Sequence, residues 1–431
     1  MKKNVLVFPC GSVAAIDIYY ALKDNLLVNV SGASSRSDHG EFVYKKYFGD
    51  LPNINDLNFI NEFNRIIVDN NIDYIIPTHD TVAYFLVKNH HLISARVLAA
   101  DLFTTTLCRY KHKTYNFFKD ETFCPLMFSS SNSVSQFPVF LKPSDGQGAQ
   151  NTFLINNIDE LYKHEFDDNW VLTEYLPGDE LSVDCFTNYK GELIFIGPRT
   201  RERILAGVSV RSRNVEISEE IASIARKINS KLNFNGYWFF QIKRNIDNEY
   251  KLLEISTRFA GTYVVNRQLD INFPLLSILN SDGVDIEIAP NNYSLICDRT
   301  ITNKYNININ YDYIYIDLDD TLIFNKKIVN SFLMMYLYQC KNKNKKIYLI
   351  TKHDSNVLNT LRECKIEPSL FDCIIHITDN TPKYNYINES EVIFIDNSFY
   401  ERLMVKRNLG IPTFDVSNVE SLIDWKECFF N

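Results

Sequence analysis

The sequence lacks several features that would assign it to a narrow class of proteins. It has no apolar run of membrane-spanning length and no visible internal repeat. Its nine cysteines are scattered without CxxC spacing, which indicates neither a zinc site nor a disulfide framework. No local signature supports a Cys–His nucleophile pair, although the sequence leaves one open. With a formal net charge of −8 and no extended basic patch, the chain is not expected to bind nucleic acid.

What is present is the composition of a folded protein. Of the 431 residues, 45% are hydrophobic and 23% are charged, and this length predicts two or three domains. The chain starts with basic residues and a short apolar stretch that stops at Pro9. We therefore expect a first strand rather than a signal peptide, and a cytoplasmic location.

The first hundred residues have the pattern of an α/β domain. Residues 4–8 predict a strand, and residues 16–22 predict a helix with helical apolar spacing. Residues 73–77 predict a second buried strand, which ends in His79 and Asp80. Open parallel sheets place ligands at such strand ends, so these side chains either face a substrate or cap the following helix.

A spaced series of polar residues follows. Lys142 ends an apolar run and precedes a turn that contains Gly146 and Gly148, where backbone N–H groups can approach a polyphosphate closely. A lysine at this point supplies a positive charge for phosphate oxygens. Residues 170–176 predict a strand whose backbone edge could hydrogen-bond a flat base, and Glu180 would suit ribose hydroxyls.

Two further strands carry candidate metal ligands. Residues 238–243 and 250–255 predict a hairpin, and the period of two places Gln241 and Glu254 on one face. An amide oxygen and a carboxylate suit magnesium that is shared with substrate phosphates. Arg258 lies just beyond and could stabilise a transferring phosphoryl group. Each residue alone is a weak signal, and the ordered set is more specific.

In this order the residues resemble the ATP-grasp superfamily, especially the branch of the carbamoyl-phosphate synthetase large chain and the amino-acid ligases. The resemblance covers about residues 1 to 290. It implies that Lys142 and the glycine turn contact the ATP phosphates and that Mg²⁺, with Mn²⁺ as an alternative, binds Gln241 and Glu254. It also implies an adenine site at Glu174, Tyr175 and Leu176, a ribose contact at Glu180, and a phosphate or acyl-phosphate contact at Arg258.

The chain departs from this family at Ser256, where the family usually has an asparagine that binds a second metal ion. A serine hydroxyl is a shorter and weaker ligand, so the second magnesium is in doubt. Residues 199–213 contain five arginines, and we expect Arg201 and Arg211 to bind the acyl-phosphate or carboxylate. Solvated strand charges are the alternative interpretation.

A second group of residues begins after the predicted strand 313–316. Asp317 and Asp319 project from the same side of the strand end, where one carboxylate can attack phosphorus and the other can protonate the leaving oxygen. This motif resembles the haloacid-dehalogenase-like (HAD) phosphatases. By that resemblance Asp317 is the nucleophile, Asp319 is the acid/base, Thr351 and Lys383 contact phosphate, and Mg²⁺ is held by Asp317, Asp319 and Asp396. The family often has a second acid after Asp396, where this chain has Asn397, and Glu401 is a candidate substitute.

The two resemblances together predict an α/β protein with three domains. These are a βα pre-ATP-grasp domain (1–105), an α+β ATP-grasp domain (106–295) and a Rossmann-like HAD domain with little or no cap (305–431). The expected function is bifunctional: an ATP-dependent carboxylate–amine ligase that forms an acyl-phosphate, and a phosphatase for a phosphorylated substrate. A homodimer is possible. The alternatives are a kinase without ligation, a nucleotide sensor or scaffold, and a chain in which only the phosphatase works.

Overall fold

The chain folds into two compact units. The computed structural model describes residues 2–146, 150–164, 167, 169–205, 207–300 and 303–423. The first unit comprises Met1–Lys23, Leu27–Val265 and Phe273–Ile288, and the second comprises Asp24–Leu26, Asn266–Asn272 and Ala289–Asn431. The three predicted domain ranges, 1–105, 106–295 and 305–431, remain a prediction. Within the described residues, no helix is long and apolar enough to cross a membrane.

The first unit begins with a five-stranded parallel sheet in the order β3-β2-β1-β4-β5. Its strands are β1 (Lys3–Phe8), β2 (Val28–Ala33), β3 (Tyr47–Phe48), β4 (Tyr74–Pro77) and β5 (Arg96–Val97). The connecting helices are α1 (Val13–Leu22), α2 (Gly40–Val43), α3 (Phe59–Asp69) and α4 (Asp80–Lys88). The face of α3 with Phe59, Phe63 and Ile67 is buried at helical spacing against this sheet.

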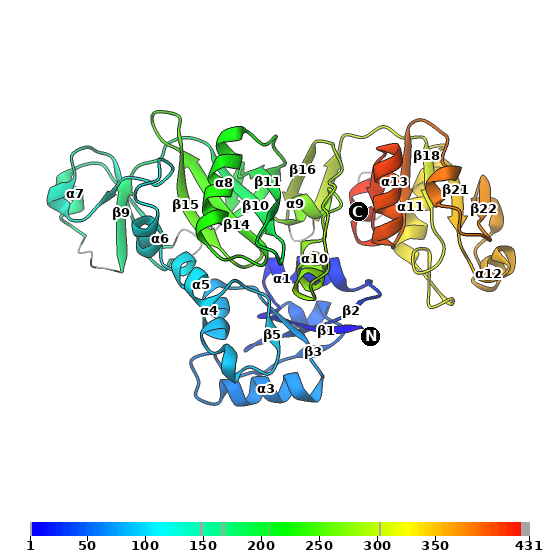
Figure 1. Cartoon of the computed structure of the whole chain (residues 1–431), viewed down its shortest axis with the longest axis horizontal. Helices are drawn as coiled ribbons and strands as arrows, with labels where there is room; N and C mark the ends of the chain where they lie inside the picture. Colours follow the sequence, from blue (N-terminus) through cyan, green and yellow to red (C-terminus); the bar gives the residue numbers. More distant parts are fainter. Residues whose placement is uncertain are drawn as a thin grey trace. The chain divides into compact units, whose positions relative to one another are not determined.

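Helices α5 (Leu102–Arg109) and α6 (Lys111–Phe117) lead to a small antiparallel sheet in the order β6-β9-β7-β8 (Figure 1). This sheet consists of β6 (Met127–Phe128), β7 (Val139–Pro143), β8 (Phe153–Ile155) and β9 (Trp170–Glu174), and the short helix α7 (Ile158–Leu161) follows β8. The buried residues Val139, Leu141 and Leu172 form its own small core with Leu161 of α7.

A second antiparallel sheet of the first unit has the order β11-β10-β14-β15. Its strands are β10 (Glu180–Thr187), β11 (Leu193–Thr200), β14 (Gly236–Arg244) and β15 (Tyr250–Ser256). The amphipathic helix α8 (Glu219–Lys231) packs Ile221, Ile224 and Ile228 into the core of this sheet. A hairpin of β12 (Arg203–Leu205) and β13 (Val208–Arg213), and helix α10 (Phe273–Ser281), complete the unit.

The second unit contains a five-stranded parallel sheet in the order β22-β21-β18-β23-β24. The strands are β18 (Tyr313–Ile316), β21 (Lys346–Thr351), β22 (Cys373–His376), β23 (Val392–Ile395) and β24 (Thr413–Phe414), and the main helices are α11 (Ser331–Asn342), α12 (Val357–Glu363) and α13 (Phe399–Leu409). Strands β16 (Leu295–Arg299) and β17 (Asn303–Ile307) form a hairpin.

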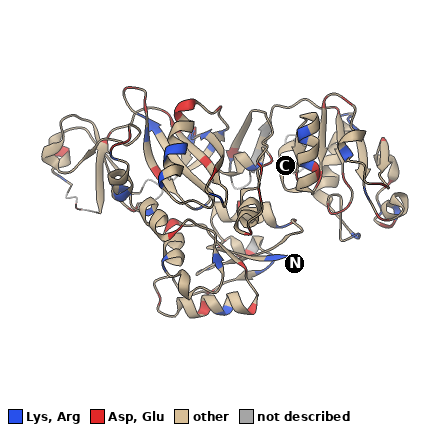
Figure 2. Ribbon diagram, viewed as in Figure 1, with Lys and Arg blue, Asp and Glu red and all other residues tan. Residues whose placement is uncertain are grey.

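The connection between β18 and β21 is short. It contains the hairpin of β19 (Ile323–Phe324) and β20 (Ile328–Val329), followed by α11. Acidic and basic residues are interspersed along the ribbon of both units (Figure 2).

Candidate functional site

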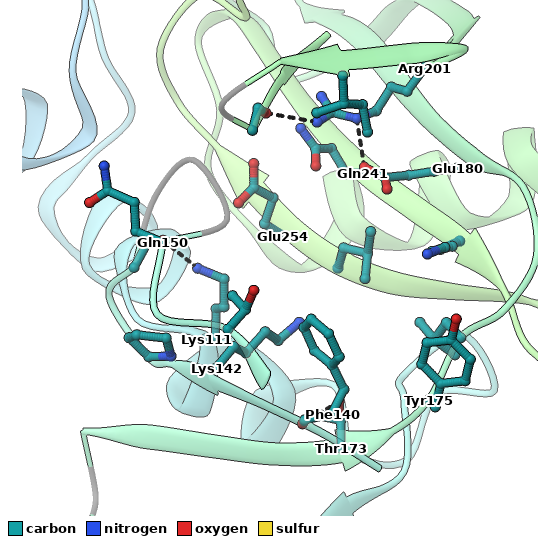
Figure 3. Close-up of a pocket in the computed structure, with 18 of the residues that line it drawn as sticks. Lys111, Phe140, Lys142, Gln150, Thr173, Tyr175, Glu180, Arg201, Gln241 and Glu254 are labelled. Atoms are coloured by element: carbon teal, nitrogen blue, oxygen red, sulfur yellow. Dashed lines mark hydrogen bonds and ion pairs between the residues drawn. The ribbon is translucent and has the colours of Figure 1, made fainter. Parts of the chain in front are cut away.

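One cavity of the first unit opens between the two antiparallel sheets. It has a volume of about 220 Å³. One wall comes from β7 and β9, and the other from β10, β14 and β15. Figure 3 shows the side chains that converge on it. The predicted nucleotide-site residues that line it are Lys142, Gly146, Glu174, Tyr175, Leu176, Glu180, Gln241 and Glu254. Gly148 lies outside the described residues.

Lys142 is buried at the end of β7, with 8% of its surface exposed. Its Nζ donates a hydrogen bond of 2.8 Å to the hydroxyl of Tyr115, which in turn donates to the backbone oxygen of Leu253. Burial, followed by the charge of Lys111, lowers the pKa of Lys142 to about 7. An anion that enters the cavity would favour the charged form of this lysine.

Lys111 supports the glycine turn and was not predicted from the sequence. Its Nζ donates a hydrogen bond of 2.7 Å to the backbone oxygen of Gly146. The turn is also tightly packed, because a Cβ atom on Gly146 would lie 3.1 Å from Cβ of Pro143. A lysine at the start of α6 carries no local signal for this contact, since the two residues are 35 positions apart.

Glu174 and Glu180, the residues predicted to contact adenine and ribose, are held by other residues of the first unit. The carboxylate of Glu174 accepts a hydrogen bond of 2.8 Å from the backbone N–H of Leu126, so its side chain joins β9 to β6. Glu180 forms an ion pair with Arg201, with 2.6 Å between Oε1 and Nε. Arg201 also donates to the backbone oxygen of Gly207 at 3.0 Å (Figure 3). Arg201 therefore belongs to the cavity wall, and its role toward an acyl-phosphate or carboxylate stays a prediction.

Gln241 and Glu254 are direct cross-strand partners on β14 and β15. Both line the cavity, and neither side chain makes a hydrogen bond or ion pair with another described residue. Two oxygen donors that face a cavity without partners fit a magnesium ion that completes its coordination with water and phosphate. Within the described residues, no group of three or more His, Cys, Asp or Glu side chains is arranged to hold a metal.

A second cavity, of about 550 Å³, shares residues with the first, namely Gly146, Gln150, Arg201, Gly207, Gln241 and Glu254. It extends to Ser12 and His79, which lie beyond the ends of β1 and β4. These parallel neighbours lie where the strand order reverses, and open sheets bind ligands at such a point. The predicted strand end at residues 73–77 thus faces a cavity.

Arg258 lines the second cavity and is held by Asp80. Its Nε donates a hydrogen bond of 2.7 Å to Asp80, and the hydroxyl of Ser256 donates one of 2.6 Å to the other carboxylate oxygen. Burial raises the pKa of Asp80, but the charge of Arg258 and the hydrogen bond from Ser256 lower it by more, so the pKa lies below its usual value. Ser256 is thus engaged with Asp80 rather than directed to a metal. His79 occupies the N-cap position of α4 without a side-chain capping hydrogen bond.

The arginine-rich stretch divides into different environments. Arg199 is fully buried and forms two hydrogen bonds with Asp184, of 2.8 and 3.2 Å, on the wall of the second cavity. Arg211 pairs with Glu202, is 42% exposed at its side chain, and lines neither cavity. The structure therefore brings Arg201 to the site together with Arg199, which the sequence did not single out. It does not bring Arg211 there.

A second cluster lies at the ends of the parallel strands of the second unit. Lys383 Nζ is 2.5 Å from Asp317 and 2.7 Å from Asp396, and all three side chains are buried. Burial and the neighbouring Asp396 raise the pKa of Asp317 to about 7, although Lys383 opposes this. Burial alone would lower the pKa of Lys383, but the two carboxylates raise it. Two acids that share one cation leave negative charge that suits a divalent metal ion.

The remaining predicted residues of this cluster do not contact Lys383. Thr351 ends β21, and its buried hydroxyl has no hydrogen-bond partner among the described residues. Asp319 contacts His353 rather than Lys383. Glu401, the candidate substitute acid, pairs with Lys352 at 2.8 Å. Asn397 is close to Thr321, with 3.2 Å between its Oδ1 and the hydroxyl.

Comparisons with known proteins address the first part of the chain. Residues 166–299 match a family model described as "ATP-grasp in the biosynthetic pathway with Ter operon". A search of curated protein sequences found no match. Among solved structures, the chain is similar to Rhizobium etli pyruvate carboxylase (18% identity, TM-score 0.58), over 69% of this chain and only 31% of that chain.

Two other solved structures are similar over most of their own length. The L-amino acid ligase from Bacillus licheniformis is 16% identical with a TM-score of 0.54, over 69% of this chain and 79% of that one. The N5-carboxyaminoimidazole synthetase from Staphylococcus aureus, complexed with ADP, is 14% identical with a TM-score of 0.56, over 70% of this chain and 83% of that one.

The solved structures show a similar fold over 69–70% of this chain, and the family model that matches residues 166–299 is an ATP-grasp model. At this identity the likeness concerns the fold. The predicted resemblance to the ATP-grasp superfamily is confirmed to that extent. The family match ends at residue 299, so the HAD-like character of the later residues stays a prediction.

Proposed function

We propose that the first unit is an ATP-dependent ligase that joins a carboxylate to an amine or a related nucleophile. The observation that carries the proposal is that the two cavities are neighbours with lining residues in common. One is lined by Lys142 and Glu180, the other by Arg258 and His79, and both share Gln241 and Glu254. A nucleotide in the first cavity would therefore direct its terminal phosphate toward a substrate in the second.

The reaction would use positioning and charge rather than a nucleophilic side chain. The substrate carboxylate attacks the terminal phosphorus of ATP, the bond to the bridging oxygen breaks, and ADP leaves. The amine then attacks the carbonyl carbon of the acyl-phosphate, phosphate leaves, and the amine loses a proton. Lys142 would neutralise the polyphosphate, and Arg258 would stabilise charge on the acyl-phosphate. Magnesium held by Gln241 and Glu254 would supply further positive charge.

The test is the release of ADP and phosphate from ATP across a panel of carboxylates and amines. We expect release to depend on one acid–amine pair and to fall by at least ~10²-fold in Glu254→Ala. The matched control is Glu249→Ala, because Glu249 is 62% exposed and lies outside both cavities. An equal loss in both variants would contradict the assignment of Glu254.

The panel also separates the alternatives. ADP formation with a stable phosphorylated product and no need for an amine would indicate a kinase. Tight ATP binding without turnover would indicate a sensor or scaffold. A second copy of the chain is a possible partner, which the mass of the protein in solution would reveal.

For the second unit we propose a magnesium-dependent phosphatase of the HAD-like type. The specific observation in its favour is Lys383 between Asp317 and Asp396, with the unpartnered hydroxyl of Thr351 at the end of β21. Asp317 would attack phosphorus and release the leaving group, which Asp319 protonates. Water would then cleave the aspartyl phosphate. The sequence predicts magnesium at Asp317, Asp319 and Asp396, but the described residues do not form such a three-acid group, because Asp319 is held by His353. Magnesium held by Asp317 and Asp396 would supply positive charge.

Hydrolysis of p-nitrophenyl phosphate in magnesium tests this second function. We expect Asp317→Asn to abolish hydrolysis and Asp312→Asn to preserve it, because Asp312 is 69% exposed and lies before β18. Should Asp317→Asn remove every measurable activity of the chain, including ADP release, the reading in which only the phosphatase works would be favoured.

A further inference from the structure

The buried side chain of His353 is not used by either proposed reaction. His353 lies two residues beyond the end of β21, and its side chain is only 1% exposed. Its Nδ1 is 2.8 and 2.9 Å from the two carboxylate oxygens of Asp319. An ionised carboxylate only accepts hydrogen bonds, so this pairing assigns the proton to Nδ1.

The far side of the imidazole is fixed as well. Its Nε2 is 2.8 Å from the hydroxyl of Thr360, on helix α12, and 2.8 Å from the hydroxyl of Ser355. The backbone oxygen of His353 is 2.8 Å from Nε2 of His376, at the end of β22. The ring is thus held between the hydroxyls of Thr360 and Ser355 and the carboxylate of Asp319, so it has little freedom to rotate.

Asp319, the acid that contacts this ring, differs from Asp317 and Asp396 in its surroundings. Asp317 and Asp396 are held by Lys383, whereas the only described side chain that contacts the carboxylate of Asp319 is His353. Asp319 is also more open, because its side chain is 36% exposed and those of Asp317 and Asp396 are 7% and 1% exposed. An exposed carboxylate on a flexible stem needs such a contact to keep one orientation.

We propose that His353 is a positioning residue that orients Asp319 toward the leaving oxygen of the phosphorylated substrate. This inference rests on the phosphatase function proposed for the second unit. His353 does not touch the substrate in this scheme. In its protonated form Asp319 donates that proton to the oxygen as the P–O bond breaks, and the ring, fixed by Thr360, keeps the carboxyl group in place through its Nδ1–H. Removal of such an outer contact typically lowers activity by ~10–100-fold.

The experiment compares two substrates in the full-length chain. The leaving group of p-nitrophenyl phosphate departs with little need for a proton, and that of glycerol 2-phosphate requires one. For His353→Ala we expect a ~10–100-fold loss of kcat on glycerol 2-phosphate, a much smaller loss on p-nitrophenyl phosphate and little change in KM. His353→Asn, whose amide nitrogen can replace the Nδ1 donor, should recover part of the lost activity.

Two further variants separate positioning from stability. Thr360→Val removes the hydroxyl that contacts Nε2 of His353 and keeps the shape of the residue-360 side chain. It should give a smaller loss of kcat than His353→Ala, again larger on glycerol 2-phosphate than on p-nitrophenyl phosphate. The double variant His353→Ala/Asp319→Asn should be no slower than Asp319→Asn alone, because both changes remove one function. Thermal unfolding of each variant in parallel identifies any that fail to fold.

The outcomes are distinguishable. Equal losses on the two substrates, additive losses in the double variant, or unchanged kinetics in both His353 variants would overturn the role of His353 while the phosphatase stands. A wild-type chain that hydrolyses neither substrate, or an Asp317→Asn variant as active as wild type, would overturn the phosphatase and this inference with it.

Discussion

The ammonium group of Lys142 occupies a position where charge is unfavourable until an anion arrives. Burial, and then the charge of Lys111, bring its pKa to about 7, so the group is partly neutral near neutral pH. The hydroxyl of Tyr115 is its only hydrogen-bond partner among the described residues. Binding of a polyphosphate would restore the charged form, and above about pH 7 it would therefore take up a proton.

We expect the affinity for ATP to fall as the pH rises from about 6 to about 8, because the proton that Lys142 needs becomes harder to obtain. Calorimetric titration in buffers of different ionisation enthalpy measures both the affinity and the proton uptake. Lys142→Met should weaken binding by ~10–100-fold and abolish the uptake. Lys163→Met, at an exposed position, serves as the control. Proton uptake that persists in Lys142→Met would assign it to another group.

The pKa of Asp317 lies above that of an ordinary surface carboxyl group. Its pKa is raised to about 7 by burial and by Asp396, so the folded chain binds a proton that the unfolded chain releases near pH 4. The contribution of this group to stability is therefore fully present below its unfolded pKa and is lost as the pH rises through 7. A divalent cation favours the ionised form and reverses this loss.

The rise in thermal unfolding temperature caused by magnesium should accordingly be larger at about pH 8 than at about pH 6. Asp317→Asn should remove most of this difference, because an amide does not titrate. Differential scanning calorimetry with and without magnesium measures both effects. A magnesium effect that is the same at both pH values would show that Asp317 is not the responsive group.

Residues whose partners are distant in sequence could not be predicted. The ion pair of Asp80 with Arg258 joins positions 178 apart, and the contact of His353 with Asp319 joins positions 34 apart. Neither contact can be predicted from local sequence patterns, because a charged residue in one segment does not affect the spacing of hydrophobic residues in another segment. By contrast, the motif order was sufficient to place Lys383 near Asp317.

At the scale of single elements, the period of hydrophobic residues predicted strands and helices, and the register of paired strands predicted which side chains face each other. The predicted hairpin places Gln241 directly opposite Glu254, because both strands alternate with a period of two. Helix α8 is marked by Ser218 at its N-cap, two acids in its first turn and a lysine in its last. Strand β17 was missed, since its asparagine-rich sequence has low strand propensity.

Ser218→Ala should destabilise the first unit by about 0.5–2 kcal/mol, because its side chain accepts a hydrogen bond from the N–H of Ile221 that would otherwise lack a partner. Ser230→Ala, near the end of the same helix, should be neutral or slightly stabilising, since alanine has the higher helix propensity. Urea unfolding of both variants measures the difference. Equal effects would indicate that the cap contributes little here.

At the scale of the whole molecule, the two units are discontinuous in sequence. The segment Asn266–Asn272 belongs to the second unit, although the residues on either side of it belong to the first. Within it, Asp270 forms an ion pair of 3.2 Å with Arg402 and accepts a hydrogen bond of 3.0 Å from Thr413. Both charged side chains are less than a tenth exposed. Local sequence patterns do not predict that a short segment inside one unit belongs to the other unit.

A fragment of residues 289–431 should therefore be less stable than one of residues 266–431. The shorter fragment removes Asp270, whereas Arg402 keeps its ion pair of 3.1 Å with Asp415, so we expect a loss below the about 3–5 kcal/mol that is typical of an unpaired buried charge. Circular dichroism during thermal unfolding compares the two fragments. Equal unfolding temperatures would show that residues 266–288 contribute nothing to the second unit.

The position of residues 266–272 within the sequence of the first unit has a consequence for how the gene is inherited. A single recombination event replaces everything on one side of a breakpoint, so it transfers intact only units that are continuous in the gene. No single breakpoint in this gene separates the codons of the two units, because those for residues 266–272 lie inside the stretch that encodes the first. Exchange of either unit with a related gene would split the other, and we expect the two units to descend together.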